Sequence, residues 1–222
     1  AVCMEHGVAL EHINYVQIHP TTLYTKKPGR SFLISESVRG EGALLYNAKM
    51  ERFANELMPR DLLTKAIRKQ MAEDGTDFVW EDLRPIGEAQ IKEHFPHIYS
   101  KCLEEGYDAT KECIPVTPAQ HYFMGGIHVD EESKTTMDHL YAIGETACNG
   151  VHGRNRLASN SLLESLVFAK RAALHILEHY ETLRGEIPAA DYSAYEPAEA
   201  LAAQRKERIL AEIERLNQND DQ

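Results

Sequence analysis

The stretch VHGRNRLASNSLLESLVFAKRAA, residues 151–173, predicts the beginning of a long buried helix. The serines and asparagine at 159–161 carry oxygens that can cap free backbone N–H groups, and Ser161 with Glu164 has the spacing of a capping box. An apolar stripe at helical spacing follows, made of Leu162, Leu163, Leu166, Val167, Ala169, Ala173, Ile176 and Leu177. Because a helix start is electropositive and Arg156 stands directly before this one, we expect an anion or an electron-rich ring there.

Read alone, residues 151–173 are equally typical of a capped core helix whose arginine pairs with a structural carboxylate. Five other blocks of sequence accompany this stretch. The other blocks are VQIHPTTLY (16–24), FLISESVRGEGALL (32–45), ELMPRDLLTKAI (56–67), AQHYFMGGIHVD (119–130) and LYAIGETACNG (140–150). The last of them is expected to be an apolar strand that runs into Gly144 and Glu145. In this order and spacing, the six blocks resemble the flavoprotein family that contains succinate dehydrogenase, fumarate reductase and L-aspartate oxidase.

Three details favour the aspartate-oxidising branch of this family over the dicarboxylate dehydrogenases. They are PRD at 59–61, SNSLLE at 159–164, and HFPHIY at 94–99 with its short link to IPVTPAQHY. The resemblance then implies FAD-dependent oxidation of L-aspartate to iminosuccinate, with electrons passed to O2 or fumarate, as the first step of de novo NAD biosynthesis. It implies L-aspartate or another C4-dicarboxylate as substrate and quinolinate synthase as a partner. The alternatives are a fumarate reductase or succinate dehydrogenase flavoprotein subunit, and a fragment that is inactive on its own.

The expected fold class is α+β, with a substrate-capping domain plus the C-terminal portion of an FAD-binding α/β domain. The resemblance divides the chain into the end of a first FAD-domain segment (1–13), the capping domain (14–122), a second FAD-domain segment (123–181), and a linker with a C-terminal helix (182–222). No G-x-G-x-x-G turn for the FAD pyrophosphate occurs in these residues. The chain is therefore expected to lack the N-terminal FAD-binding half and to hold FAD poorly by itself.

Local signals predict several elements inside these segments. Strands are expected at 14–20 and 32–35, and a helix is expected from Arg60 to about Glu73, where Asp74 and Gly75 stop it. A pair of helices should be split at Pro96 and closed by Gly106. Residues 182–195 read as a linker, and residues 199–216 read as a charged helix with a thin apolar stripe.

Oxidation of a four-carbon amino diacid needs cations for two carboxylates, a group that handles the amine proton, and a flavin that accepts hydride. Arginine captures a carboxylate with its planar fork, and histidine can donate one more hydrogen bond. The motifs supply His19, Arg60, His121 and Arg156, although each taken singly is also typical of a structural role. The resemblance implies that His19, His121 and Arg156 bind the substrate carboxylates and that Ser35 adds a hydroxyl.

For catalysis, the resemblance makes Arg60 the active-site arginine that acts as acid or base near the C2–C3 bond of the substrate. Arginine gives up its proton reluctantly in ordinary settings, so electrostatic stabilisation of the transition state is the alternative role. Glu36 and Arg39 resemble the relay that couples Arg60 to solvent, while a plain surface ion pair explains their spacing equally well.

For the cofactor, the resemblance implies that Glu145 binds a ribityl or ribose hydroxyl of FAD. Ser161 and Leu162 would contact the isoalloxazine ring through backbone groups at the helix start. An electropositive helix end near flavin N1 and O2 would stabilise the reduced anion.

Composition excludes some functions. A formal net charge of −11 over 222 residues argues against nucleic acid and anionic membranes as partners, and no apolar run approaches the roughly 18 residues of a membrane span. The four cysteines form no CxxC pair, which indicates reduced thiols in the cytoplasm. His175 and His179 match the H-x-x-E-H zinc motif, but no third ligand is apparent, so no metal is expected.

Overall fold

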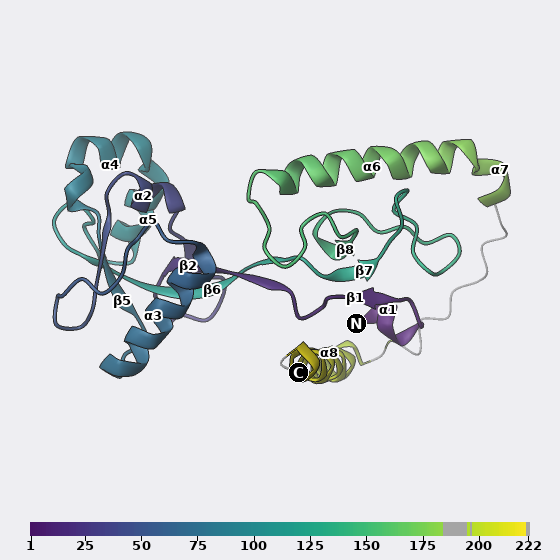
Figure 1. The fold of residues 1–222 in the computed structure, drawn as a ribbon, viewed down its shortest axis with the longest axis horizontal. Coiled ribbons are helices and arrows are strands. Elements are labelled where there is room, and N and C mark those ends of the chain that lie inside the picture. The colour runs from purple at the N-terminus through teal and green to yellow at the C-terminus, as the bar shows by residue number, and fades with distance from the viewer. Residues whose placement is uncertain (184–194, 196, 221–222) are drawn as a thin grey trace. The chain divides into compact units, whose positions relative to one another are not determined.

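The computed structural model describes residues 1–183, 195 and 197–220. The chain forms two compact units, which Figure 1 labels by element. We call residues 18–121 the inserted unit, and residues 1–17 with 122–222 the flanking unit. The predicted linker at 182–195 lies almost wholly outside the described residues, because 184–194 are not among them.

The inserted unit is built on a five-stranded sheet with strand order β3-β2-β6-β5-β4. The pairs β2/β3, β4/β5 and β5/β6 are antiparallel. The strands are β2 (Val16–Leu23), β3 (Phe32–Leu33), β4 (Leu44–Tyr46), β5 (Val79–Asp82) and β6 (Ile114–Phe123), so β2 and β6 each begin or end in the flanking unit. The helices are α2 (Glu36–Gly40), α3 (Arg60–Asp74), the short η1 (Arg84–Ile86), α4 (Glu88–His94) and α5 (Pro96–Glu104).

The local signals in the inserted unit are confirmed in most places. Helix α3 ends where it was predicted to end, and Gly75 caps it in the left-handed conformation with φ 66° and ψ 35°. Pro96 separates α4 from α5 as expected. The strand expected at 14–20 is shifted to Val16–Leu23, and the strand expected at 32–35 is shortened to Phe32–Leu33. These elements enclose one large apolar core that includes Leu45, Leu63, Ile67, Ile91, Ile114 and Val116.

The flanking unit contains a smaller sheet with strand order β1-β7-β8. Its elements are α1 (Val2–Glu5), β1 (Leu10–Glu11), β7 (Gly126–His128), η2 (Gly144–Thr146), β8 (Ala147–Cys148), α6 (Asn160–Glu178), α7 (Tyr180–Leu183) and α8 (Ala198–Asp220). Two adjacent glycines allow neighbouring backbone segments to approach this sheet closely. A Cβ on Gly125 would lie 1.8 Å from the His12 carbonyl oxygen, and one on Gly126 would lie 2.3 Å from that of Thr146.

The strand predicted at 140–145 is wrong. Tyr141 forms only an isolated bridge to Lys134, and the backbone then turns through η2, so the strand β8 follows Glu145 instead of preceding it. The segment pairs with its own neighbour, since the Ala142 N–H donates to the Ser133 carbonyl at 3.1 Å. A local hairpin contact therefore replaces the expected strand.

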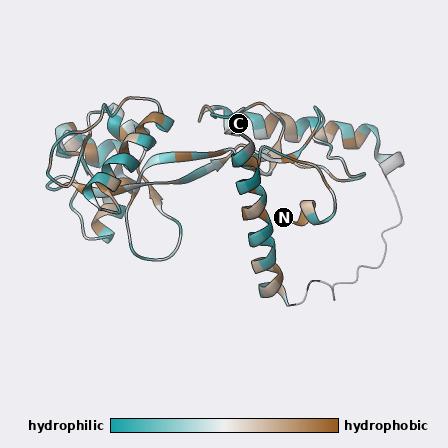
Figure 2. Ribbon diagram, turned by 60° about the horizontal axis from the view of Figure 1, so that its bottom comes forward, coloured by the Kyte–Doolittle hydropathy of each residue, from teal (hydrophilic) through white to brown (hydrophobic). Residues whose placement is uncertain are grey.

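Helix α6 forms as predicted, but the burial predicted for its apolar stripe is wrong. Leu162 is 80% exposed, Leu166 71% and Leu177 73%, and the buried residues of the helix are Glu164 and Ala172. Figure 2 shows brown apolar segments alternating with teal polar ones along α6 and α8. The apolar core of this unit is small, consisting of Val129, Ala142 and Ala147 with Ile127 against them. Within the described residues, no element covers the leucine face of α6.

The C-terminal helix α8 extends the predicted range at both ends. Leu201, Ile209, Ile213 and Leu216 are half-buried, as its thin apolar stripe suggests. Polar contacts link α8 to the start of the chain, among them the ion pairs of Glu5 with Arg205 at 3.0 Å and with Arg208 at 3.8 Å. Asn14 also donates a hydrogen bond to Asn217 at 3.2 Å. None of the helices in the described part of the chain combines the length and the apolar character that a membrane span requires.

Candidate active site

The inserted unit brings together six of the residues expected at the site, and His19 lies at their centre. His19 is on β2 and only 2% exposed. Its ring meets the ring of His121, on β6, edge to face with centroids 5.5 Å apart. Its Nε2 lies 2.7 Å from the carbonyl oxygen of Ile34, which can only accept, so Nε2 carries the proton of a neutral ring. A neutral His19 can accept a hydrogen bond at Nδ1 but has no N–H left to donate to a carboxylate.

The charge state of His19 follows from its surroundings. Burial lowers its pKa to about 4, and the positive charges of Arg39 and Arg60 act in the same direction. The Ile34 carbonyl opposes this shift but does not outweigh it. Since the folded pKa lies below the ordinary value of 6.5, protonation favours the unfolded chain. The contribution of His19 to stability is therefore present above about pH 6.5 and is lost as the pH falls towards 4.

We expect His19 to stay neutral, with its proton on Nε2, from about pH 8 down to about pH 5. Titration of the imidazole ¹⁵N resonances by NMR measures this directly. His94 provides an internal control, because its hydrogen bond to Glu41 at 2.7 Å raises the pKa of His94 above its usual value. A His19 resonance that titrates together with or above His94 would contradict the neutral assignment.

Arg60 and Glu36 form the strongest polar contact of this group. Arg60 is the first residue of α3, and its Nε donates to Glu36 Oε2 at 2.7 Å while Nη2 contacts the same oxygen. Arg60 Nη1 is buried without a hydrogen-bond partner. Burial opposes the ionisation of Glu36, but the hydrogen bonds and charge of Arg60 outweigh it and hold the pKa of Glu36 below its usual value. Ser35 caps α2, since its Oγ accepts from the Ser37 N–H at 3.3 Å.

Arg39 is buried, in contrast to the plain surface ion pair that its spacing from Glu36 also allowed. It is 3% exposed, and its Nη1 donates to the Glu56 carbonyl oxygen at 3.0 Å. Its Nε and Nη2 have no hydrogen-bond partner. Burial lowers the pKa of Arg39, and the negative charges of Glu81 and Glu36 act against that shift. Glu36 is thus bonded to Arg60 and only electrostatically coupled to Arg39.

A pocket of about 330 Å³ lies beside His121 within the inserted unit. It is lined by Thr22, Gly29, Arg30, Ser31, Leu33, Ala119, Gln120 and His121. One cation, two hydroxyls, one side-chain amide and one imidazole line it, which is a composition suited to a small polar anion.

The flanking unit holds the remaining four expected residues, and Arg156 is the most buried of them. It is 6% exposed, and its guanidinium carbon lies 4.0 Å from the centre of the Tyr122 ring. Its Nη2 donates to Gln17 Oε1 at 3.0 Å, and Gln17 Nε2 donates back to the Arg156 carbonyl at 2.9 Å. Gln17 and Tyr122 were not predicted as site residues, although both lie inside motifs that the sequence singled out. Together they fix the guanidinium plane.

The capping box predicted for Ser161 and Glu164 is wrong. The N-cap of α6 is Ser159, which makes no side-chain cap. The Ser161 hydroxyl instead donates to the Ala158 carbonyl at 2.9 Å and accepts from Arg156 Nη1. Glu164 is buried and bonded to Asn149. The serine therefore positions the arginine, and no side-chain cap occupies the backbone N–H groups of the first turn.

This helix start suits one edge of a flavin. Uncapped N–H groups and exposed Leu162 present polar and apolar surface side by side, which matches a ring system with a polar edge and apolar faces. Glu145 lies on η2 in the same unit, where its Oε1 accepts from the Phe123 N–H at 2.9 Å and the side chain remains exposed. A carboxylate in this position can still accept a hydrogen bond from a hydroxyl of a bound cofactor.

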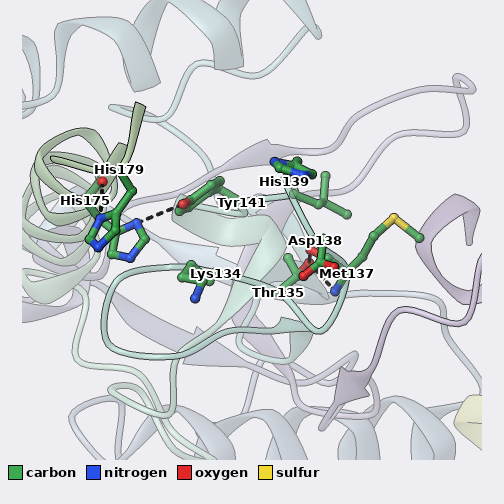
Figure 3. Close-up of a pocket in the computed structure, with 9 residues that line it drawn as sticks. Lys134, Thr135, Met137, Asp138, His139, Tyr141, His175 and His179 are labelled. Carbon is green, nitrogen blue, oxygen red and sulfur yellow. Dashed lines mark hydrogen bonds between the residues drawn. The ribbon is translucent and has the colours of Figure 1, made fainter. Parts of the chain in front are cut away.

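The histidines of the H-x-x-E-H motif lie elsewhere, at the far end of α6. Figure 3 shows His175 and His179 beside Tyr141 in a surface pocket of about 320 Å³. The two rings stack with centroids 4.1 Å apart, Tyr141 Oη lies 2.9 Å from His175 Nδ1, and His179 Nδ1 bonds the His175 carbonyl at 2.9 Å. Over the described residues, no group of three or more metal-ligating side chains is found.

Solved structures with the same fold define the class of protein. The chain matches E. coli quinol fumarate reductase FrdA carrying an E245Q mutation, with TM-score 0.72 and 33% identity over 92% of this chain and 38% of that one. It also matches Sdh1 of Mycobacterium smegmatis, with TM-score 0.69 and 32% identity over 90% of this chain and 35% of that one. The fold is therefore that of the fumarate reductase and succinate dehydrogenase flavoproteins. Residues 2–162 match the FAD binding domain family, and the chain belongs to that family of flavin-dependent oxidoreductases.

Among curated relatives, the similarity is to L-aspartate oxidases. The chain is 52% identical over 183 residues to the L-aspartate oxidase of Clostridium perfringens, covering 82% of this chain and 42% of the relative. It is 43% identical over 199 residues to that of Streptomyces coelicolor, covering 85% of this chain and 34% of the relative. The chain thus spans about two fifths or less of the length of these relatives.

Proposed function

We propose that this chain is the substrate-capping and C-terminal FAD-domain portion of an L-aspartate oxidase. In this proposal the inserted unit corresponds to the capping domain expected at 14–122, and the flanking unit carries the FAD-domain segments 1–13 and 123–181. The reaction removes two hydrogens from L-aspartate to give iminosuccinate, with O2 or fumarate as the final acceptor, in the cytoplasm at the start of NAD biosynthesis. Quinolinate synthase would consume the product and is the partner that we propose.

The observation that carries the proposal is the Arg60–Glu36 pair beside the His19–His121 ring pair. Glu36 holds the Arg60 guanidinium, but Arg60 Nη1 has no hydrogen-bond partner and can still donate to a carboxylate of a bound dicarboxylate substrate. The 52% identity to an L-aspartate oxidase favours an amino diacid as that substrate.

The charge of each site residue decides the role that we assign to it. Arg156 would neutralise one substrate carboxylate, with a hydrogen bond from His121 and a hydroxyl from Ser35. Arg60 would contact the other carboxylate and stabilise mainly the charge that develops near the C2–C3 bond in the transition state. His19 is neutral with its one N–H on Ile34, so we assign it to accept a hydrogen bond from the substrate amine at Nδ1. That bond would orient the uncharged amine, the form from which hydride leaves more readily.

FAD, when bound, supplies the acceptor for the two electrons and the Cα hydrogen. The residues that would hold it here are Glu145, through a ribityl or ribose hydroxyl, and the backbone of Ser161 and Leu162 at the start of α6. The partial positive charge of that helix end would stabilise negative charge on the reduced ring. Glu36 and Arg39 would keep Arg60 charged and oriented between turnovers.

The second candidate is a dicarboxylate dehydrogenase, favoured by the 33% identity to the fumarate reductase chain. Anaerobic mixing of substrate with the FAD-loaded full-length protein that contains this chain separates the two candidates. We expect L-aspartate to bleach the flavin absorption and succinate to leave it unchanged. Bleaching by succinate alone would move the chain to the dehydrogenases, and no bleaching by either compound would reject both candidates.

A further inference from the structure

One buried carboxyl in the inserted unit has no role in the reaction described so far. Glu81 lies on β5 and is 0% exposed, and Val79 on the same strand and Leu83 just after it are also buried, at 1% and 0%. Neither of its carboxyl oxygens has a hydrogen-bond partner. An unpaired ionised carboxylate is costly in such a place, so its presence calls for a compensating charge.

Arg39 is the cation that compensates Glu81. Among charged groups, Arg39 acts most strongly on Glu81, and Glu81 acts most strongly on Arg39. Arg39 is equally enclosed and keeps Nε and Nη2 without hydrogen-bond partners. Contacts through β4 place both residues in one region, since Arg39 Nη1 donates to the Glu56 carbonyl at 3.0 Å and Glu56 Oε1 accepts from the Leu45 N–H at 3.0 Å. Leu45 in turn pairs with Glu81 across β4 and β5. Because this region is buried, little solvent screens the two charges.

Few other titratable groups act on this pair. Glu56 adds negative charge near Glu81, but Arg52 neutralises it through an ion pair at 2.8 Å. Cys102, from α5, is buried, and burial with the charge of Glu81 raises its pKa to about 12, so it stays a neutral thiol. The negative charge of Glu36 also raises the pKa of Arg39, as that of Glu81 does, and the positive charge of Arg60 lowers it.

We infer that Glu81 is the buried counter-ion of Arg39 and acts as a positioning residue. Its charge state sets the pH range in which Arg39, Glu36 and Arg60 together support oxidation. This inference rests on the proposed function. With Glu81 ionised, two arginines face two carboxylates and the cluster is neutral. With Glu81 protonated, the uncompensated charge of Arg39 competes with Arg60 for Glu36. Arg60 then loses part of the contact that orients it.

The direction of the pH dependence follows from the burial of Glu81. Burial raises the pKa of Glu81 to about 7, although the charge of Arg39 lowers it and only partly offsets the burial. The ionised, charge-compensated state therefore forms as the pH rises through about 7. Turnover of L-aspartate should increase over the same interval.

The test compares wild type with Glu81→Gln and Glu81→Asp in the FAD-loaded protein. We expect the kcat of wild type to rise with pH through one ionisation near pH 7. Glu81→Gln should lack this step and remain about tenfold below wild type on the alkaline side, with little change in KM. Glu81→Asp keeps a carboxyl and should restore a step at a displaced pH. The control Asp82→Asn, on the same strand but paired with Arg84, should keep the wild-type step.

A second readout does not depend on turnover. Infrared difference spectra between acid and alkaline pH should show the carbonyl band of a protonated carboxyl in wild type and lack it in Glu81→Gln. Arg39→Gln should raise the midpoint of this band, because the stabilising cation is removed. If L-aspartate is not oxidised, the proposed function fails and the infrared midpoint alone decides the charge pairing. A wild-type kcat step in Glu81→Gln, or an infrared midpoint unmoved by Arg39→Gln, overturns the inference.

Discussion

Replacing Arg60 by leucine is expected to lower the kcat for L-aspartate by roughly a thousandfold or more while FAD remains bound. Glu36 Oε2 accepts from this guanidinium through Nε at 2.7 Å and through Nη2. Leucine removes the cation that would stabilise the transition state and leaves Glu36 without its partner. The measurement is steady-state oxidation together with the flavin absorption of the purified variant.

A matched control lies on the same helix. Arg68 is exposed on α3, two turns after Arg60, so Arg68→Leu makes the same chemical change away from the candidate site. We expect Arg68→Leu to keep wild-type turnover and the same flavin content. Turnover of Arg60→Leu within tenfold of wild type would refute the catalytic role of Arg60.

The sequence predicts best those elements whose signals are local. Helix α3 needs only its apolar spacing and the left-handed Gly75, and the break between α4 and α5 needs only Pro96. Such signals act over a few residues, so no knowledge of distant contacts is required. The capping box failed because Ser161 bonds Arg156 and the Ala158 carbonyl, and spacing alone does not reveal that competition.

Burial was harder to predict than secondary structure. The apolar stripe of α6 indicated a buried helix, yet Leu162 and Leu177 are exposed, because periodicity identifies an apolar face without identifying what packs on it. Glu81 shows the opposite error. From the sequence, a glutamate between Val79 and Leu83 is expected to be exposed to solvent. Its burial is explained by the charge of Arg39, which is distant in sequence.

In the candidate site, too, some residues could be predicted from the sequence while the contacts between them could not. Family resemblance supplied Arg60 and Glu36, but their hydrogen bond joins residues 24 apart in sequence and no local pattern predicts it. Gln17 and Tyr122 were overlooked because a glutamine and a tyrosine inside a strand are also typical of ordinary β-structure. Their contacts with Arg156 identify them as positioning residues.

The second large effect is expected for Arg156→Leu, which should raise the KM for L-aspartate about a hundredfold and change kcat much less. The guanidinium is held by Gln17 at 3.0 Å and by the Tyr122 ring at 4.0 Å, so it is already ordered for binding a carboxylate. Loss of a charge-assisted pair made in both ground and transition states weakens binding mainly. Steady-state kinetics of the FAD-loaded protein separate KM from kcat.

Two further variants decide whether the effect reports a carboxylate contact. Arg156→Lys keeps the charge but loses the planar fork, so its KM should lie between those of wild type and Arg156→Leu. Arg154→Leu, two residues earlier, removes an exposed arginine that packs over the Tyr15 ring at 5.1 Å, and it should leave KM near wild type. If Arg154→Leu raised KM as much as Arg156→Leu, general loss of positive charge would explain both results. The carboxylate contact assigned to Arg156 would then be wrong.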